Sequence, residues 1–126
     1  MIVAIDTSSF VAYLSGNSGF DVEIIDKILD EHRAVVPSVV LSEILSDHRL
    51  PKEIIKSLRN IPLLDIGTGF WERAGKLRAK ILSAGHKARL ADALIAQNCI
   101  DHNVSLVTRD KDFRHFVRIA GLKILS

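Results

Sequence analysis

Apolar and polar residues follow one another in blocks along this chain, and the blocks predict strands that alternate with helices. The short, almost uniformly apolar run at residues 1–5 is typical of a strand buried in a parallel sheet, and short runs at residues 34–37 and 105–108 predict further strands. Longer segments with apolar side chains at every third or fourth position predict amphipathic helices, and residues 21–32 carry one such apolar stripe. The alternation therefore favours an α/β fold, in which helices cover both faces of a parallel sheet.

The whole pattern predicts five strands and seven helices. We expect the strands at 1–5, 34–37, 61–66, 105–108 and 122–125, and the helices at 8–14, 21–32, 39–48, 52–60, 68–83, 88–102 and 110–117. Thr7, Ser8 or Ser9 is expected to cap the first helix, and Ser38 the third. Because no repeat, low-complexity tract or linker interrupts the pattern, we expect residues 1–126 to form a single domain.

Composition narrows the class of protein. With 126 residues, 48% of them apolar, the chain can bury a core without disulfides or a structural metal. The one cysteine, Cys99, lies in an apolar helical stretch and is expected in the core. No signal-peptide pattern is seen at the N-terminus, and no apolar stretch reaches the ~20 residues of a membrane span. We therefore expect a soluble, cytoplasmic protein with no membrane association.

The net charge of +2 says little, but the basic residues are gathered into residues 73–89 and 109–118. Clustered Lys and Arg side chains can neutralise the phosphates of a nucleic acid. A solvated helix face explains such clusters equally well when each is taken alone.

Acidic residues occupy unusual positions in the pattern. Asp6 ends the first strand, Glu43 and Asp92 lie in otherwise apolar helical segments, and Asp110 follows the fourth strand. A helix cap, a turn or the polar face of a helix explains each of them singly. Their convergence is what suggests a site, because parallel strands end at the same edge of a sheet and ligands bind there.

Several carboxylates at one edge would repel one another unless a cation neutralised them. Oxygen ligands without His or Cys favour Mg²⁺ or Mn²⁺, which can activate water for attack on a phosphodiester. Thr7, Ser8 and Thr108 are placed to hydrogen-bond these carboxylates or metal-bound waters, although helix capping and packing remain open for them.

Four segments, IDTSSFVAYL, VPSVVLSEIL, RLADALIAQ and LVTRDKDF, occur in the order and spacing of the PIN domain, so the chain resembles this family over nearly its whole length. Its size is similar to that of the stand-alone ribonuclease toxins called VapC. The resemblance implies a three-layer α/β/α domain with a central five-stranded parallel sheet. It also implies an Mg²⁺- or Mn²⁺-dependent endoribonuclease whose metal and catalytic pocket corresponds to Asp6, Glu43, Asp92 and Asp110.

The resemblance further implies partners. Toxins of this family are typically homodimers, and each is inhibited by a cognate antitoxin that inserts a C-terminal segment into the acid pocket. Operator DNA is bound through the antitoxin. For the RNA substrate, we expect contacts from Lys87, Arg89, Arg109 and Lys111.

Two acids compete for the fourth position, because TRDKDF contains both Asp110 and Asp112. Asp110 is favoured since it lies closer to the strand end, and Asp112 is kept as an outer or alternative ligand. Asp47 could share the helix face of Glu43, but a solvated charge explains it more simply.

Two other classes of protein share parts of the pattern. A phosphoacceptor receiver domain would place Asp65 at the end of the third strand, but it needs a Lys after the fifth strand and Lys123 falls inside it. A non-catalytic RNA-binding or scaffold module on the same fold could lose one or more acids. All four acidic positions are filled here, which favours an active site.

Overall fold

A parallel sheet of four strands forms the centre of the computed structural model, which describes residues 1–125. The strands lie in the order β3-β2-β1-β4. Their bounds are β1 Val3–Ile5, β2 Ala34–Pro37, β3 Leu63–Leu64 and β4 Ser105–Val107. All three residues of β1 are fully buried, and this strand pairs with β2 on one side and with β4 on the other.

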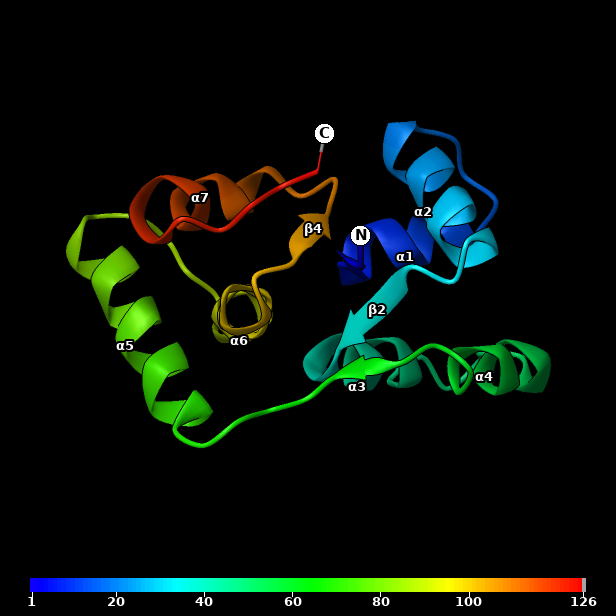
Figure 1. Cartoon of the computed structure of the whole chain (residues 1–126), viewed down its shortest axis with the longest axis horizontal. Coiled ribbons are helices and arrows are strands. Elements are labelled where there is room, and N and C mark those ends of the chain that lie inside the picture. The colour runs from blue at the N-terminus through cyan, green and yellow to red at the C-terminus, as the bar shows by residue number, and fades with distance from the viewer. Residues whose placement is uncertain (126) are drawn as a thin grey trace.

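Helices cover both sides of this sheet. Their bounds are α1 Thr7–Leu14, α2 Phe20–Asp30, α3 Ser38–Leu45, α4 Lys52–Leu58, α5 Phe70–Ser83, α6 Leu90–His102 and α7 Arg114–Ala120, with a short 3₁₀ helix at Lys111–Phe113. In Figure 1, α5, α6 and α7 lie to the left of the strands, and α2 and α4 lie to the right. The α/β fold with a parallel sheet is thus confirmed, and the ends of the helices differ from the predicted ones by a few residues.

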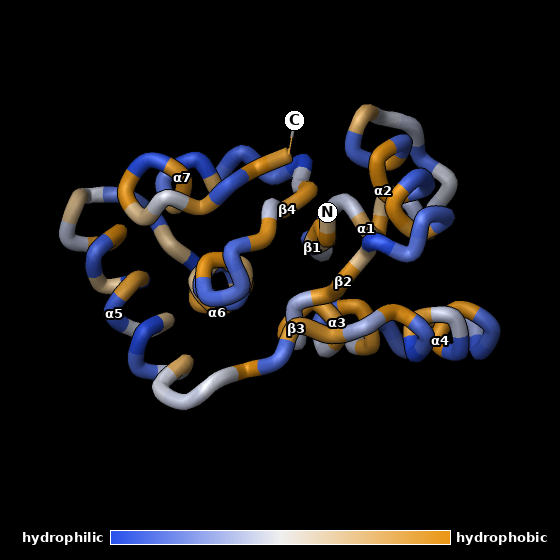
Figure 2. Tube along the Cα trace, viewed as in Figure 1, coloured by the Kyte–Doolittle hydropathy of each residue, from blue (hydrophilic) through white to orange (hydrophobic). Residues whose placement is uncertain are grey.

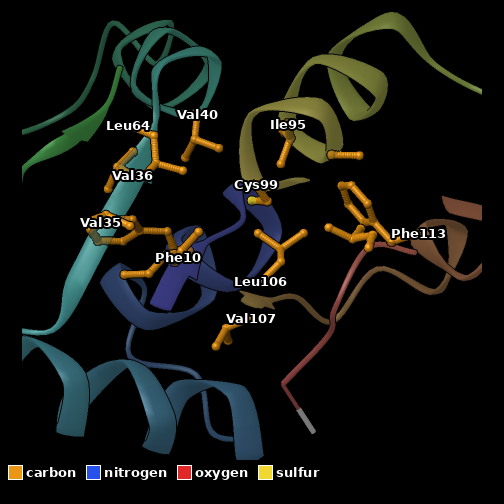
Figure 3. Packing of buried hydrophobic residues seen from close by; sticks show 14 of the residues in the cluster. Phe10, Val35, Val36, Val40, Leu64, Ile95, Cys99, Leu106, Val107 and Phe113 are labelled. Carbon is orange, nitrogen blue, oxygen red and sulfur yellow. The ribbon is translucent and has the colours of Figure 1, made fainter. Parts of the chain in front are cut away.

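The core lies where the inner faces of the helices meet the sheet. Figure 2 shows hydrophobic residues along much of β1, β2 and β4. In Figure 3, Phe10, Val36 and Leu106 project into the core from α1, β2 and β4. Cys99 on α6 is fully buried among them, and burial raises the pKa of its thiol to about 12. The expectation that Cys99 is a core residue is confirmed.

The predicted fifth strand is wrong in extent. Residues 122–125 add only one parallel bridge, between Leu106 and Ile124. The two backbone hydrogen bonds that join this segment to β4 run from Leu106 N to Lys123 O and from Leu125 N to Leu106 O. Both involve the same residue of β4 and measure 2.9 Å. Because the pairing does not extend beyond Leu106, the sheet has four strands and one bridge rather than five strands.

The predicted cap at Ser38 is also wrong. Pro37 takes the N-cap position of α3, and the Ser38 hydroxyl donates instead to the carbonyl oxygen of Leu64, at 3.1 Å. This bond ties the start of α3 to β3, next to the edge where the strands end.

The receiver-domain alternative is excluded by the order of the strands. That fold has the order 2-1-3-4-5, in which the third strand lies beside the first. Here β3 lies beside β2 at the outer edge, and Asp65 after it is exposed. No helix within residues 1–125 is long and apolar enough to cross a membrane.

Candidate functional site

Four acidic side chains come together at the edge where the parallel strands end. Asp6 directly follows β1 and Asp110 follows β4, while Glu43 lies on α3 after β2 and Asp92 lies in the first turn of α6. All four line one cavity of about 230 Å³. The other residues of this acid cavity are Thr7, Ser8, Arg89 and Ala91. Residues far apart in the sequence are therefore brought to one place by the parallel topology.

Asp6 is the most buried of these acids, with 3% of its surface exposed. It occupies the N-cap position of α1 but makes no side-chain capping hydrogen bond. Its carboxylate instead accepts hydrogen bonds from Ser8 Oγ at 2.8 Å and from Thr108 Oγ1 at 2.7 Å. Burial raises the pKa of Asp6, these hydrogen bonds oppose the rise, and the charge of Asp110 adds to it. Asp6 is thus held in one orientation by two hydroxyl groups.

Asp92 is buried as well, and burial raises the pKa of its carboxyl to about 6. The Arg89 guanidinium acts against this rise, while the charges of Asp110 and Asp6 add to it. A carboxyl with this pKa exchanges its proton close to neutral pH, which is typical of functional sites.

Arg89 joins two of the acids. Its Nε donates to Asp92 Oδ2 at 3.2 Å, and its Nη2 donates to Asp110 Oδ2 at 2.9 Å. The other carboxylate oxygen of Asp110 accepts from the backbone N–H of Asp112 at 2.9 Å, so Asp110 also caps the 3₁₀ helix. One side chain that is 69% exposed therefore neutralises two carboxylates of the cavity.

Glu43 lies at the outer rim of the acid cavity and is exposed. Its Oε1 accepts a hydrogen bond of 2.6 Å from Thr7 Oγ1. This bond connects α3 to the first residue of α1 and so holds Glu43 on the side of the cavity next to Asp6.

Asp112 and Asp47 do not join the acid cavity. Asp112 is exposed and contributes only its backbone N–H, to Asp110. Asp47 lines a different cavity and forms an ion pair with Arg49 at 3.3 Å. Of the two acids in TRDKDF, only Asp110 lines the acid cavity.

The four basic residues expected to contact RNA are placed differently from one another. Arg89 pairs with two acids, Arg109 pairs with Asp21, and Lys87 and Lys111 are exposed. The pairing of Arg89 with Asp92 has a sequence signal, since the two residues are three apart at the start of a helix. Its contact with Asp110 has no such signal, because the two residues are far apart in the sequence and meet only in the fold.

Sequence reasoning missed a clamp between α2 and the loop after β4. Arg109 donates from Nε to Asp21 Oδ2 at 2.7 Å and from Nη2 to Asp21 Oδ1 at 2.9 Å. These bonds lower the pKa of Asp21 to about 2. Gly19 leaves room for the clamp, because a Cβ there would lie 2.7 Å from Asp21 Oδ1 at a φ of 147°. The clamp fixes the loop that carries Thr108 and Asp110.

The donor set of the acid cavity fits a hard divalent cation. It offers carboxylate oxygens, with hydroxyl groups that orient them, and contains no His or Cys. Within residues 1–125, no three His, Cys, Asp or Glu side chains are arranged to hold a metal ion as they stand. Arg89 already binds Asp92 and Asp110, so a metal would have to compete with its guanidinium for these two carboxylates.

Solved structures with the same fold include several toxin–antitoxin complexes. A chain in the structure of VapBC2 from Rickettsia felis, bound to a DNA fragment from their promoter, matches with a TM-score of 0.75 and 22% identity, covering 99% of this chain and 98% of that chain. A chain of VapBC-1 from nontypeable Haemophilus influenzae matches with a TM-score of 0.75 and 17% identity, covering 100% and 98%. A chain of FitAcB from Neisseria gonorrhoeae has a TM-score of 0.73 and 16% identity, covering 99% and 97%. At these identities the likeness shows the fold.

Sequence comparison identifies the family. No curated protein matches the chain significantly. A family model described as PIN domain matches residues 3–119, which is most of the sequence. The chain therefore belongs to the PIN domain family.

Proposed function

We propose that this protein is a metal-dependent endoribonuclease, the VapC-type toxin of a toxin–antitoxin pair. The observation that carries the proposal is the acid cavity at the carboxyl ends of the strands, where Asp6, Glu43, Asp92 and Asp110 meet. Membership of the PIN domain family and the fold shared with toxin–antitoxin complexes support it.

Asp6, Glu43, Asp92 and Asp110 would hold Mg²⁺ or Mn²⁺, directly or through water. When bound, the ion supplies Lewis-acid chemistry to an RNA phosphodiester and its attacking water, and the products are a 5′-phosphate and a 3′-hydroxyl. Ser8 and Thr108 orient the carboxylate of Asp6, and Thr7 orients that of Glu43.

Substitution of single acids tests this proposal. We expect Asp6→Asn and Asp92→Asn each to reduce RNA cleavage by about 100-fold or more, since each removes a charge from the donor set while keeping its size. Asp112→Asn is the matched control and should keep most of the activity, because Asp112 lies outside the cavity. Cleavage that survives either of the first two substitutions, in protein freed of contaminating nuclease, would contradict the assignment.

The partners follow from the same proposal. We propose a cognate antitoxin that blocks the acid cavity, a homodimer in solution, and binding of operator DNA through the antitoxin only. The Rickettsia felis structure is one of VapBC2 bound to a DNA fragment from their promoter, which supports an antitoxin and operator DNA as partners. A cytoplasmic location would bring the protein together with RNA.

One observation favours a second candidate, an RNA-binding PIN module without catalysis. Arg89 holds Asp92 and Asp110 in ion pairs, which a permanently inactive site could retain. RNA binding by the protein with Mn²⁺ present and no cleavage of any RNA would favour this second function.

A further inference from the structure

A second cavity, open to solvent and about 500 Å³ in volume, meets the acid cavity at Asp110, which lines both. The segment after β4, α7 and Ile124 near the C-terminus form it. We call it the basic cavity. Its walls carry Lys111, Arg114 and Arg118, and its apolar lining includes Phe113, Val117 and Ile124.

Within residues 1–125, no ion pair neutralises the three basic side chains in its walls. Among residues 1–125, no acidic side chain lies within salt-bridge distance of Lys111, Arg114 or Arg118. All three residues are exposed, whereas Arg89 and Arg109 are paired with acids. The acidic residue of the lining, Asp110, is already bound by Arg89. Three adjacent cations with no ion-pair partner among the described residues favour a polyanion as the occupant.

The apolar lining indicates which polyanion fits. Val117 is 39% exposed and Ile124 is half-buried, so hydrophobic surface lies between the cations and is open to a ligand. Bases of single-stranded RNA can lie on such a surface while their phosphates contact Lys and Arg, whereas duplex RNA hides its base faces in the stack. The chemistry therefore favours a single strand over a duplex.

We infer that the basic cavity binds the stretch of single-stranded RNA adjoining the phosphodiester that lies in the acid cavity. This inference rests on the proposed function, since it gives the substrate of that function its path across α7. Lys111, Arg114 and Arg118 hold phosphates, and Val117 and Ile124 contact a base.

Equilibrium binding without cleavage tests the inference directly. Fluorescence anisotropy with a labelled single-stranded RNA, in EDTA and at several salt concentrations, would compare the wild type with the double variant Arg114→Gln/Arg118→Gln. The matched control is Lys52→Gln/Lys56→Gln, which removes the same charge from α4, at the other end of the molecule from α7 (Figure 1).

We expect the Arg114→Gln/Arg118→Gln protein to bind more weakly than the control. The slope of log affinity against log salt should fall in magnitude by about 1.4, because each phosphate contact to a single strand contributes about 0.7. A duplex of the same sequence should bind the wild type more weakly than the single strand. Thermal melting followed by circular dichroism checks that both double variants are folded. Lys111→Gln, which removes the third cation of the basic cavity, should also weaken RNA binding.

Equal RNA affinity and equal salt slopes for the two double variants would overturn the inference, and so would tighter binding of the duplex. If binding of an acidic peptide depends on Arg114 and Arg118 while binding of RNA does not, the cavity belongs to a protein partner. That result would also overturn the inference. The proposed function can fail on its own. Wild-type protein that binds RNA through this cavity but cleaves none in Mn²⁺ would refute the nuclease function and leave the binding inference intact.

Discussion

At the scale of single residues, Asp92 shows how the acid cavity opposes the stability of the fold. Its carboxyl has a pKa of about 6 in the folded chain, against an ordinary value of 3.8. The unfolded chain therefore loses this proton more easily, and the folded state is penalised once Asp92 is charged. The penalty is complete above pH 6 and absent below about pH 4.

We predict that Asp92→Asn stabilises the protein at pH 8 by about 1 kcal/mol, less than the full pKa shift would give because solvent screens the charge. The neutral amide avoids the cost of burying a carboxylate and can still accept a hydrogen bond from Arg89. Thermal melts at pH 8 and pH 4 measure the effect, which should shrink at the lower pH. A lower melting temperature than that of the wild type at pH 8 would show that the charge of Asp92 is favourable in the fold.

Arg89 should compete with a metal ion for the same carboxylates. We predict that Arg89→Gln tightens Mn²⁺ binding by up to about fivefold, because an exposed ion pair contributes about 1 kcal/mol or less. Isothermal titration of the protein with MnCl₂ measures this without any RNA. Lys87→Gln is the control, since it removes a nearby positive charge from an exposed side chain that pairs with no acid within residues 1–125.

A similar gain in Mn²⁺ affinity for Lys87→Gln would assign the effect to net charge, and unchanged affinity in Arg89→Gln would remove Arg89 as a competitor.

Sequence reasoning found Asp92 because an acid in an apolar helix is conspicuous. It assigned Arg89 to RNA, since its ion pair with Asp110 depends on two loops meeting in the fold.

At the scale of elements, the clamp between Asp21 and Arg109 fixes the loop after β4 against α2. We predict that Arg109→Gln destabilises the protein by about 0.5–1 kcal/mol, because both side chains are partly exposed. Urea denaturation at neutral pH measures the loss. Lys111→Gln, a change of the same charge at the start of the following 3₁₀ helix, should leave the midpoint unchanged.

The loss of stability caused by Arg109→Gln should also depend on pH. The pKa of Asp21 is lowered to about 2 from 3.8, so the clamp contributes stability above about pH 4 and loses it as the pH falls toward 2. A difference between variant and wild type that is constant over this range would mean that Arg109 stabilises the loop by packing and not by charge.

The secondary structure was largely predictable because apolar runs and stripes differ in length and period. The segment 122–125 was not, because its apolar residues are also what a strand contains and only its short pairing with Leu106 limits it to a bridge. The clamp could not be predicted either, because Asp21 and Arg109 lie in distant segments and no sequence pattern links them.

At the scale of the whole molecule, the convergence of the four acids follows from topology. Parallel strands that end at one edge carry Asp6 and Asp110 there, and the adjoining helices bring Glu43 and Asp92. The sequence could predict this meeting but not its details, because burial, rotamers and the position of Arg89 depend on packing between distant segments. That the chain forms a single domain stays a prediction, and Ser126 lies outside the described residues.

RNA cleavage by one preparation of the protein, first stripped of metal with EDTA and then supplied with excess Mn²⁺, tests the central claim most directly. We predict no cleavage after stripping and full recovery with Mn²⁺, with products that carry a 5′-phosphate and a 3′-hydroxyl. An Asp6→Asn sample purified in parallel should stay inactive throughout, which controls for contaminating nucleases. Cleavage that continues in EDTA at the same rate, with Asp6→Asn still inactive, would contradict a metal-dependent mechanism in the acid cavity.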